Sequence, residues 1–470
     1  MKYFVWIVLI IITIGRVFGQ HQELSEKPNI WNNVTPKKDT TKLLDALRFG
    51  TIHGHFRYFL SMTDNTSNLS DYYAQAIGGG LRFESKSFYN FNIAVSGFYI
   101  FPLKSSDLWA KDSITGQINR YELGLFDLKN TDDLSEFNLL EELYLQYQYK
   151  NISAKFGRQL INTPFINLQD GRMRPTSVEG FWVEGKINNK SRLQGGWMFG
   201  IGPRSTSQWF SMGASIGIYP SGVGIDGKKS NYYNNTTTGG VGMINYQFKP
   251  TNNFKADIWY NYIQNISNTY LIQIEKKYTL SNSELQFGFQ GAAQTKSGDG
   301  GNSDMALAYH QNSKTVWIGG FQMSAKHGKF AQALSFNRIS ADGRYLMPRE
   351  WGRDYFYTFM PRERNEGFGD VTAITFKVQL RRPKKLNPSI LVGYFDLPDV
   401  KNFTLNKYGL SSYGQLNVDL RYKFGGSLAG LESQVLYVYK KNFGETYGDY
   451  KYQFNKTGMQ LLNVVLNFKF

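Results

Sequence analysis

The chain has 470 residues, contains no cysteine, is 16% aromatic and carries a formal net charge of +16. Its mean hydropathy of −0.40 excludes a bundle of apolar transmembrane helices, but it permits a β-barrel, in which half of each strand faces water. In a soluble protein this positive charge would suggest nucleic acid as a partner. In a barrel, where we expect no nucleic acid, the same charge predicts a basic lumen that attracts anions.

The first 48 residues divide into two segments. In residues 1–19, Lys2 precedes an apolar run from Tyr3 to Ile14, which is too short to span a bilayer and is followed by a small residue at Gly19. We therefore expect 1–19 to be a secretory signal peptide. Residues 20–48 are polar and show no strand alternation, which predicts a periplasmic N-terminal tail with one helical turn near Leu43.

From residue 49 onward, apolar and polar residues alternate in segments of about ten residues, the length of a tilted membrane strand. This pattern predicts an all-β fold, a transmembrane antiparallel β-barrel of about 18 strands that occupies residues 49–470 as one domain. The expected strands are 49–60, 73–83, 90–101, 139–149, 152–160, 177–187, 191–199, 239–249, 254–263, 269–278, 284–294, 314–326, 330–338, 371–381, 389–396, 413–424, 431–440 and 458–470.

The last expected strand shows the alternation most clearly. One face of Gln460 to Phe470 carries Leu462, Leu466 and Phe470, and the other carries Asn463 and Lys469. A terminal aromatic residue on such a strand resembles the terminal signal of bacterial outer-membrane barrels. We therefore expect a multi-pass barrel in a bacterial outer membrane, in contact with its lipid, that is recognised by the barrel assembly machinery through this strand.

The connections between the expected strands give independent information, because transmembrane barrels alternate short periplasmic turns with longer outer loops. The even-numbered connections are short, such as Lys150-Asn151, and most odd-numbered ones are long. With an even number of strands, both ends of the barrel fall on the periplasmic side. We expect no plug domain, and therefore no energy coupling. The long connections are 102–138, 161–176, 200–238, 295–313, 339–370 and 441–457.

One block of sequence resembles a known family. It contains Gly157-Arg158-Gln159, then Thr163-Pro164, then Arg172-Met173-Arg174-Pro175, and finally Val178-Glu179-Gly180. This order of motifs is similar to that of the OprD family of outer-membrane porins. The resemblance implies an 18-stranded barrel narrowed by inward-folded loops, a wall with a ladder of basic side chains, and passive diffusion of small solutes, often carboxylates.

Basic residues on the water-facing side of the strands are the first candidates for the solute path. Guanidinium and ammonium groups can replace water around a carboxylate at successive shallow sites. Each of these residues could equally be a solvated wall residue, but together they set the potential of the pore. The pore-lining candidates are Arg57, Arg82, Lys377, Arg381, Arg421 and Lys423, and the constriction-loop candidates are Arg172 and Arg174.

Arg158 does not fit the alternation, because Phe156 has the same parity and would turn Arg158 toward lipid. We expect a bulge after Gly157 to turn Arg158 into the lumen, although the side chain could instead reach the outer membrane interface. Four acidic residues also point inward by parity and could accept an ammonium group of a zwitterion. The alternative is that they pair with basic neighbours across strands and stiffen the wall. They are Glu84, Glu142, Glu184 and Asp419.

We therefore predict a porin for carboxylates, amino acids or small peptides, and not an enzyme. An outer-membrane hydrolase would need a base beside a nucleophile, and none of the five histidines has such a spacing. An adhesion or structural barrel that uses its outer loops stays open, as does a homo-oligomer. We expect no cofactor and no metal, because His53 and His55 share a strand face but lack a third ligand.

Overall fold

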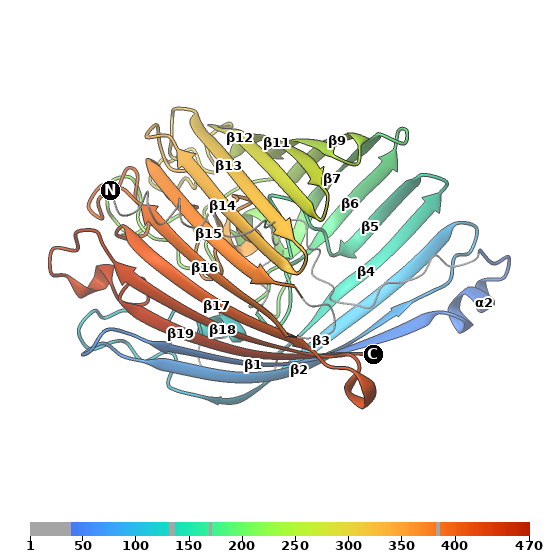
Figure 1. Cartoon of the computed structure of the whole chain (residues 1–470), viewed down its shortest axis with the longest axis horizontal. Helices are drawn as coiled ribbons and strands as arrows, with labels where there is room; N and C mark the ends of the chain where they lie inside the picture. The colour runs from blue at the N-terminus through green and yellow to red at the C-terminus, as the bar shows by residue number, and fades with distance from the viewer. Residues whose placement is uncertain (1–38, 131–136, 169–171, 382–385) are drawn as a thin grey trace.

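The computed structural model describes residues 39–130, 137–168, 172–381 and 386–470. Within these ranges, 18 long antiparallel strands form one closed barrel, as predicted (Figure 1). The expected signal peptide, 1–19, and residues 20–38 of the expected tail lie outside the described residues. No helix of the described part is long and apolar enough to cross a membrane.

The strands lie close to their predicted positions. The strands of the barrel are β1 (Thr51–Asp64), β2 (Tyr72–Glu84), β3 (Phe91–Ser105), β4 (Phe137–Tyr149), β5 (Ile152–Gln159), β6 (Ser177–Lys186), β7 (Ser191–Gly202), β9 (Val241–Thr251), β10 (Phe254–Ile263), β11 (Ser267–Leu280), β12 (Ser283–Lys296), β13 (Val316–His327), β14 (Phe330–Ile339), β15 (Val371–Leu380), β16 (Leu386–Asp396), β17 (Tyr413–Lys423), β18 (Leu431–Asn442) and β19 (Met459–Lys469).

Short elements lie outside the barrel. Helix α2 matches the turn expected near Leu43, whereas the two-residue strand β8, which pairs with β7, was not predicted. A strand this short has no alternation that a sequence could show. The short elements are α2 (Leu43–Arg48), η1 (Leu123–Leu125), β8 (Phe210–Ser211), α3 (Met212–Ser215), η2 (Arg349–Trp351), η3 (Gly426–Leu428) and η4 (Tyr450–Tyr452).

The first and last strands close the barrel. β1 pairs antiparallel with β19 from His55 opposite Lys469 to Asp64 opposite Gln460. Two further backbone hydrogen bonds join Gly54 and Phe470, with N···O distances of 2.9 and 3.1 Å. Every long strand therefore has a neighbour on both sides, which satisfies the backbone groups that a hydrocarbon environment cannot.

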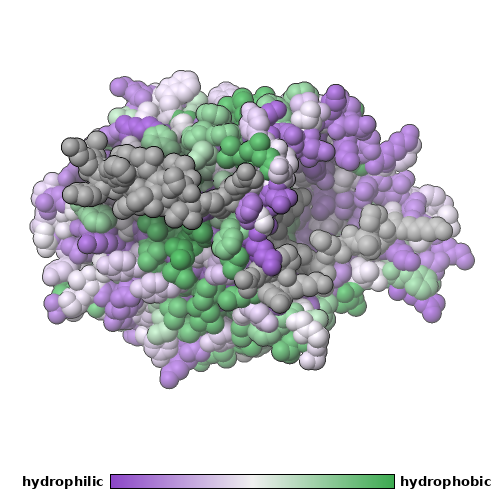
Figure 2. Space-filling model, viewed as in Figure 1, coloured by the Kyte–Doolittle hydropathy of each residue, from purple (hydrophilic) through white to green (hydrophobic). Residues whose placement is uncertain are grey.

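The outward face of the barrel is apolar. Alternate residues of β1, including Ile52, Phe56 and Met62, are exposed on this face, and so are Leu466 and Phe468 of β19. Figure 2 shows hydrophobic side chains gathered over the middle of the visible face and hydrophilic ones mostly toward its ends. This distribution suits a molecule whose middle lies in hydrocarbon.

The long connections lie at one end of the barrel, and several of them fold into it. We number these outer loops by their order along the chain, and by their described residues they are L2 (106–130), L3 (160–168 and 172–176), L4 (203–240), L7 (340–370), L8 (397–412) and L9 (443–458). Leu123 and Phe126 of L2 pack with the inward-facing wall residues Phe59 and Val465 and with Met173 of L3. The upper lumen is therefore partly filled by loops, which is why some inward wall positions are apolar.

Gly157, the glycine of the Gly-Arg-Gln motif, is required by the backbone. Its φ is +117°, and a Cβ atom there would lie 2.3 Å from the carbonyl oxygen of Leu143. The substitution Gly157→Ala should therefore destabilise the barrel by about 1–3 kcal/mol, which urea unfolding of the protein in detergent can measure. Gly319→Ala is the control, because nothing lies within 4 Å of a Cβ at Gly319. Equal stability of the two variants would contradict this account of the motif.

Candidate functional site

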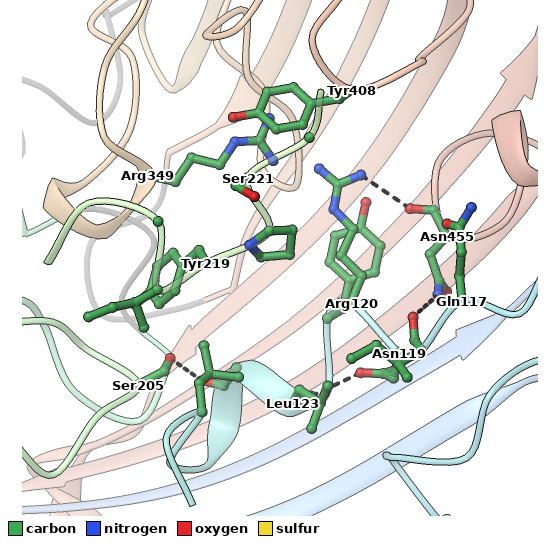
Figure 3. Close-up of a pocket in the computed structure, with 18 of the residues that line it drawn as sticks. Gln117, Asn119, Arg120, Leu123, Ser205, Tyr219, Ser221, Arg349, Tyr408 and Asn455 are labelled. Carbon is green, nitrogen blue, oxygen red and sulfur yellow. Dashed lines mark hydrogen bonds between the residues drawn. The ribbon is translucent and has the colours of Figure 1, made fainter. Parts of the chain in front are cut away.

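The outer loops enclose a cavity of about 1010 Å³ inside the barrel (Figure 3). The described residues that line it belong to L2, L3, L4, L7, L8 and L9 and to residue Leu307 of the loop between β12 and β13. The cavity is thus formed by loop residues that the strands hold in place.

The cavity is strongly basic. Among the described lining residues, eight are arginine or lysine and one, Glu363, is acidic. A single-sign cluster within low-dielectric walls concentrates the field and raises the local concentration of anions. The eight basic residues are Arg120, Arg172, Arg204, Lys229, Arg349, Arg362, Arg364 and Lys456.

Aromatic rings support several of these guanidinium groups. The guanidinium carbon of Arg349 lies 3.6 Å from the ring centre of Tyr408, and that of Arg204 lies 4.8 Å from the ring centre of Tyr219. Arg120 comes from L2 and Arg349 from L7, so the charges reach the cavity from different loops (Figure 3). Stacking orders these side chains without neutralising their charge.

Carboxylates lie behind the cavity surface. Glu366 is buried beside Nε of Arg349, at 2.8 Å, and Nζ of Lys407, at 3.7 Å. Glu350 accepts hydrogen bonds from the backbone N–H groups of Gly217 and Tyr219 at 3.0 and 2.8 Å. Burial raises the pKa of Glu350, whereas in Glu366 the nearby cations outweigh burial and the pKa lies below its ordinary value.

L7 crosses the lumen and is bound to the wall on both sides. On β12, the amide of Gln290 bonds to the backbone of L7 at 2.8 and 3.2 Å. On β17, the amides of Gln415 and Asn417 donate to the carbonyl oxygen of Pro361 at 2.9 and 3.1 Å. On β18, the ammonium group of Lys440 pairs with the carboxylate of Glu363. L7 therefore holds three cavity residues, Arg362 to Arg364, in a fixed position.

Two of the predicted wall residues lie well inside the barrel. Nη1 of Arg57 donates to the carbonyl oxygen of Arg172 at 2.6 Å, so this side chain supports L3 from the wall. Arg82 is buried and pairs with Glu142 at 3.0 Å and with Glu84 at 2.6 Å. Both face inward as the alternation predicts.

The other predicted wall bases, like Arg82, lie toward the end with short connections. Lys377 is buried on β15, and Arg381 follows the last residue of β15. Nε of Arg421 lies 2.9 Å from Asp419, and Nζ of Lys423 lies 2.9 Å from Glu432. The remaining predicted acid, Glu184, pairs with Arg192 of the next strand. All four predicted acids lie beside a base, which for Glu142 and Glu184 belongs to another strand and for Glu84 and Asp419 belongs to the same strand.

The two constriction candidates have different positions. Arg172 lines the cavity. Arg174 does not, because its fully buried guanidinium group donates to the carbonyl oxygens of Pro203 and Thr206 at 3.0 and 2.6 Å, and lies 3.7 Å from Glu141. Arg174 thus ties L3 to L4.

The bulge expected after Gly157 is absent, and the prediction that it turns Arg158 inward was wrong. The pairing of β5 with both neighbours is continuous, so Arg158 stays opposite the lipid-facing Leu143. Its guanidinium group lies 3.3 Å from Glu179 and 4.4 Å from the ring centre of Trp209. This ion pair allows a cation on the outward face near the outer end.

Most of the cavity bases were not predicted. Strand alternation says nothing about loop residues, because a loop can fold into the lumen or away from it. Charged clusters in the long connections, such as the triplet Arg362-Glu363-Arg364 in 339–370, were the local signs of charged loops. His53 and His55 were not expected to bind a metal, and the described residues hold no group of three or more potential ligands.

The ion pairs of L7 give it a defined pH dependence. The pKa of Glu363 lies below its ordinary value, because the ion pair with Lys440 and the nearby charge of Arg120 outweigh the effect of burial, and Lys407 and Arg349 lower the pKa of Glu366 in the same way. The ionised carboxylates of Glu363 and Glu366 therefore stabilise the folded loop above pH 4.5. This stabilisation is lost as the pH falls below 4.5 and the carboxylates are protonated. Burial raises the pKa of Asp354 to about 6, so protonation of Asp354 between pH 7 and 5 favours the folded loop.

Hydrogen exchange of L7, corrected for intrinsic rates, should therefore show no loss of protection from pH 7 to 5 and a loss below pH 4.5. The amide of Gly367, which donates to the carbonyl oxygen of Tyr345 at 2.7 Å, is a suitable probe. The hairpin of β13 and β14 is the internal control. Loss of L7 protection already at pH 6 would contradict the assignment.

The chain was compared with known families and structures. It matches the family described as outer membrane porin, OprD family, over residues 117–359. The fold is similar to that of OccD3 (OpdP) of Pseudomonas aeruginosa, with a TM-score of 0.70 and 15% identity over 96% of this chain and 99% of that one. No curated protein sequence matches significantly.

Two further solved structures are similar. Acinetobacter baumannii OccAB4 has a TM-score of 0.67 and 14% identity, over 89% of this chain and 98% of that one. Pseudomonas aeruginosa OpdK with vanillate has a TM-score of 0.64 and 14% identity, over 90% and 99%. The family match spans more than half of the chain and confirms the predicted resemblance. The protein therefore belongs to the OprD family of porins and is a passive channel of the bacterial outer membrane rather than an enzyme.

Proposed function

We propose that the channel prefers small anionic solutes, carboxylates above all, and that the loop-lined cavity is where it selects them. The observation that carries this proposal is the composition of the cavity, which has eight basic lining residues and one acidic one. Guanidinium groups replace the hydration shell of a carboxylate through charge-assisted hydrogen bonds. A solute with a negative charge therefore enters the cavity more readily than a neutral or cationic one.

The strand-borne bases continue the path beyond the cavity. Arg57, Arg82, Lys377 and Arg421 face the lumen from four different strands. Because Arg82 and Arg421 are each paired with acids, their net attraction for an anion is weak. Weak sites suit diffusion, since a solute must leave each site as well as enter it.

The inward acids favour net anions over zwitterions. Glu84, Glu142, Glu184 and Asp419 all lie beside arginines, so an ammonium group would have to compete with a guanidinium group for each of them. Amino acids and small peptides should therefore pass less readily than monocarboxylates of similar size. One structural neighbour, OpdK, was solved with vanillate, an anion of the proposed class.

The proposal includes two partners outside the solute path. The barrel assembly machinery would recognise β19 and Phe470, whose alternate residues face outward. A homo-oligomer would form through the outward apolar face.

Planar-bilayer recordings of the purified protein should show stepwise conductance with anion preference. The preference should be largest at low salt and should fall as salt rises, because the Debye length shrinks from about 30 Å at 0.01 M to about 3 Å at 1 M. Liposome uptake of a small carboxylate should exceed that of an amino acid and of a neutral sugar of similar size. Cation preference, or faster sugar uptake, would contradict the proposal.

A pair of arginine substitutions tests whether charges in the cavity, rather than charges on the outward face, set the ion selectivity. Arg120 lines the cavity, where its direct contacts are a hydrogen bond of 3.5 Å to the carbonyl oxygen of Asn455 and the ring of Tyr121 at 5.5 Å, so Arg120→Gln removes a charge and few contacts. This variant should have a lower anion-to-cation permeability ratio, read from the reversal potential in a salt gradient. Arg158→Gln should leave the ratio unchanged, because Arg158 lies on the outward face. The reverse result would place the selecting charges elsewhere.

A further inference from the structure

A chain of four side chains joins L2 to L7 through the barrel wall. Oε1 of Glu122 in L2 accepts a hydrogen bond from Oγ of Ser61 on β1 at 2.8 Å. Oγ of Ser61 accepts one from Nδ2 of Asn463 on β19 at 3.0 Å. Oδ1 of Asn463 accepts one from Nε of Arg362 in L7 at 3.0 Å. We call this set the seam relay, because it crosses the β1–β19 seam that closes the barrel.

The donors and acceptors of the seam relay run in one direction. Ser61 and Asn463 are directly opposite each other in the β1–β19 pairing, and they are 2% and 1% exposed. The hydroxyl group of Ser61 donates its one hydrogen to Glu122 and accepts from the amide of Asn463. The relay thus begins at a guanidinium group and ends at a carboxylate, so each bond polarises the next in the same sense.

The L7 end of the relay is a strained residue. Arg362 has φ = +72°, a conformation that a bulky side chain adopts only when its surroundings impose it. Nζ of Lys440 donates to the carbonyl oxygen of Arg362 at 2.9 Å and lies 3.4 Å from the hydroxyl oxygen of Tyr121 in L2. Contacts to the wall therefore hold Arg362 in this conformation.

Both ends of the relay border the cavity. Asn119, Arg120 and Tyr121 of L2 and Arg362 of L7 all line it. Asn119 itself bonds to Glu122 through its side-chain amide at 2.5 Å. The relay therefore connects the two loop segments that carry Arg120 and Arg362.

We propose that Ser61 and Asn463 are positioning residues that couple L2 to L7 and so fix the basic side of the cavity. This rests on the proposed function only in that the cavity is the solute path. If the two loops were anchored independently, loss of one anchor would loosen one loop. If the relay couples them, loss of any link loosens both.

The test uses planar-bilayer recordings of three single variants. Asn463→Ala and Ser61→Ala should raise the rate of switching between conductance sublevels about fivefold, the effect of losing one net hydrogen bond, and should lower the anion-to-cation permeability ratio. Asn245→Ala is the matched control: Asn245 is a buried inward amide on β9 that bonds to Gln194 and to the backbone of β10. Its switching rate should equal that of the wild type.

A double-mutant cycle distinguishes coupling from independent anchors. Ser61 and Arg362 have no hydrogen bond to each other, so for independent anchors the effects of Ser61→Ala and Arg362→Met on the logarithm of the switching rate would add. The seam relay predicts that the double variant switches no faster than the faster single variant. Additive effects, or equal rates in Ser61→Ala and the wild type, would overturn the inference.

Separate controls are needed for the folding of the variants and for the function of the wild-type protein. Heat-modified migration in gels identifies variants that form closed barrels. If Asn463→Ala does not form one, the result is taken from Ser61→Ala and from the double-mutant cycle. Ser61→Ala removes only one hydroxyl group. Absence of conductance in the wild-type protein would overturn the proposed function. Anion-preferring wild-type conductance with unaltered switching in folded variants would overturn the relay alone.

Discussion

The structure depends on closure of the barrel between β1 and β19. In hydrocarbon no water is available for unpaired backbone N–H and C=O groups, so every membrane strand needs two neighbours. The register of this seam, with His55 opposite Lys469, also decides which side chains of the two strands face inward together. Ser61 and Asn463 lie opposite each other for this reason. The strand pairing that closes the barrel therefore also positions the two side chains that bond to L2 and L7.

A closed barrel of this width has an interior that the strands alone do not fill, and the loops supply the constriction. L2 and L7 both pack apolar side chains against the wall, and L7 is also held by wall amides and a buried ion pair. The polar contacts of L7 have a physical reason. L7 carries charged residues at the cavity, and its backbone must be satisfied by polar wall groups because water is largely excluded there.

The strands of the barrel could be predicted from the sequence, whereas the residues that line the cavity could not. Alternation with period 2 located β10 to the residue and the other long strands within a few residues, because lipid on one side and water on the other impose that period. Arg57 and Arg82 face inward for the same reason. The position of Arg349 or Arg362 depends on where L7 folds, which tertiary contacts determine and no local pattern records. The prediction for Arg158 was wrong because it assumed a bulge after Gly157 to turn a cation away from lipid, and the continuous register of β5 excludes that bulge.

The choice of arginine in the cavity follows from the need to hold a charge without cancelling it. Six of the eight basic lining residues are arginines. A guanidinium group can stack on a tyrosine ring, as Arg349 does on Tyr408, and its planar donors match a carboxylate. A lysine ammonium group can also lie over a ring, but it is a strongly hydrated point charge without planar donors. The carboxylates behind the surface, such as Glu366, limit the net field, and a limited field lets an anion bind in the cavity and still leave it.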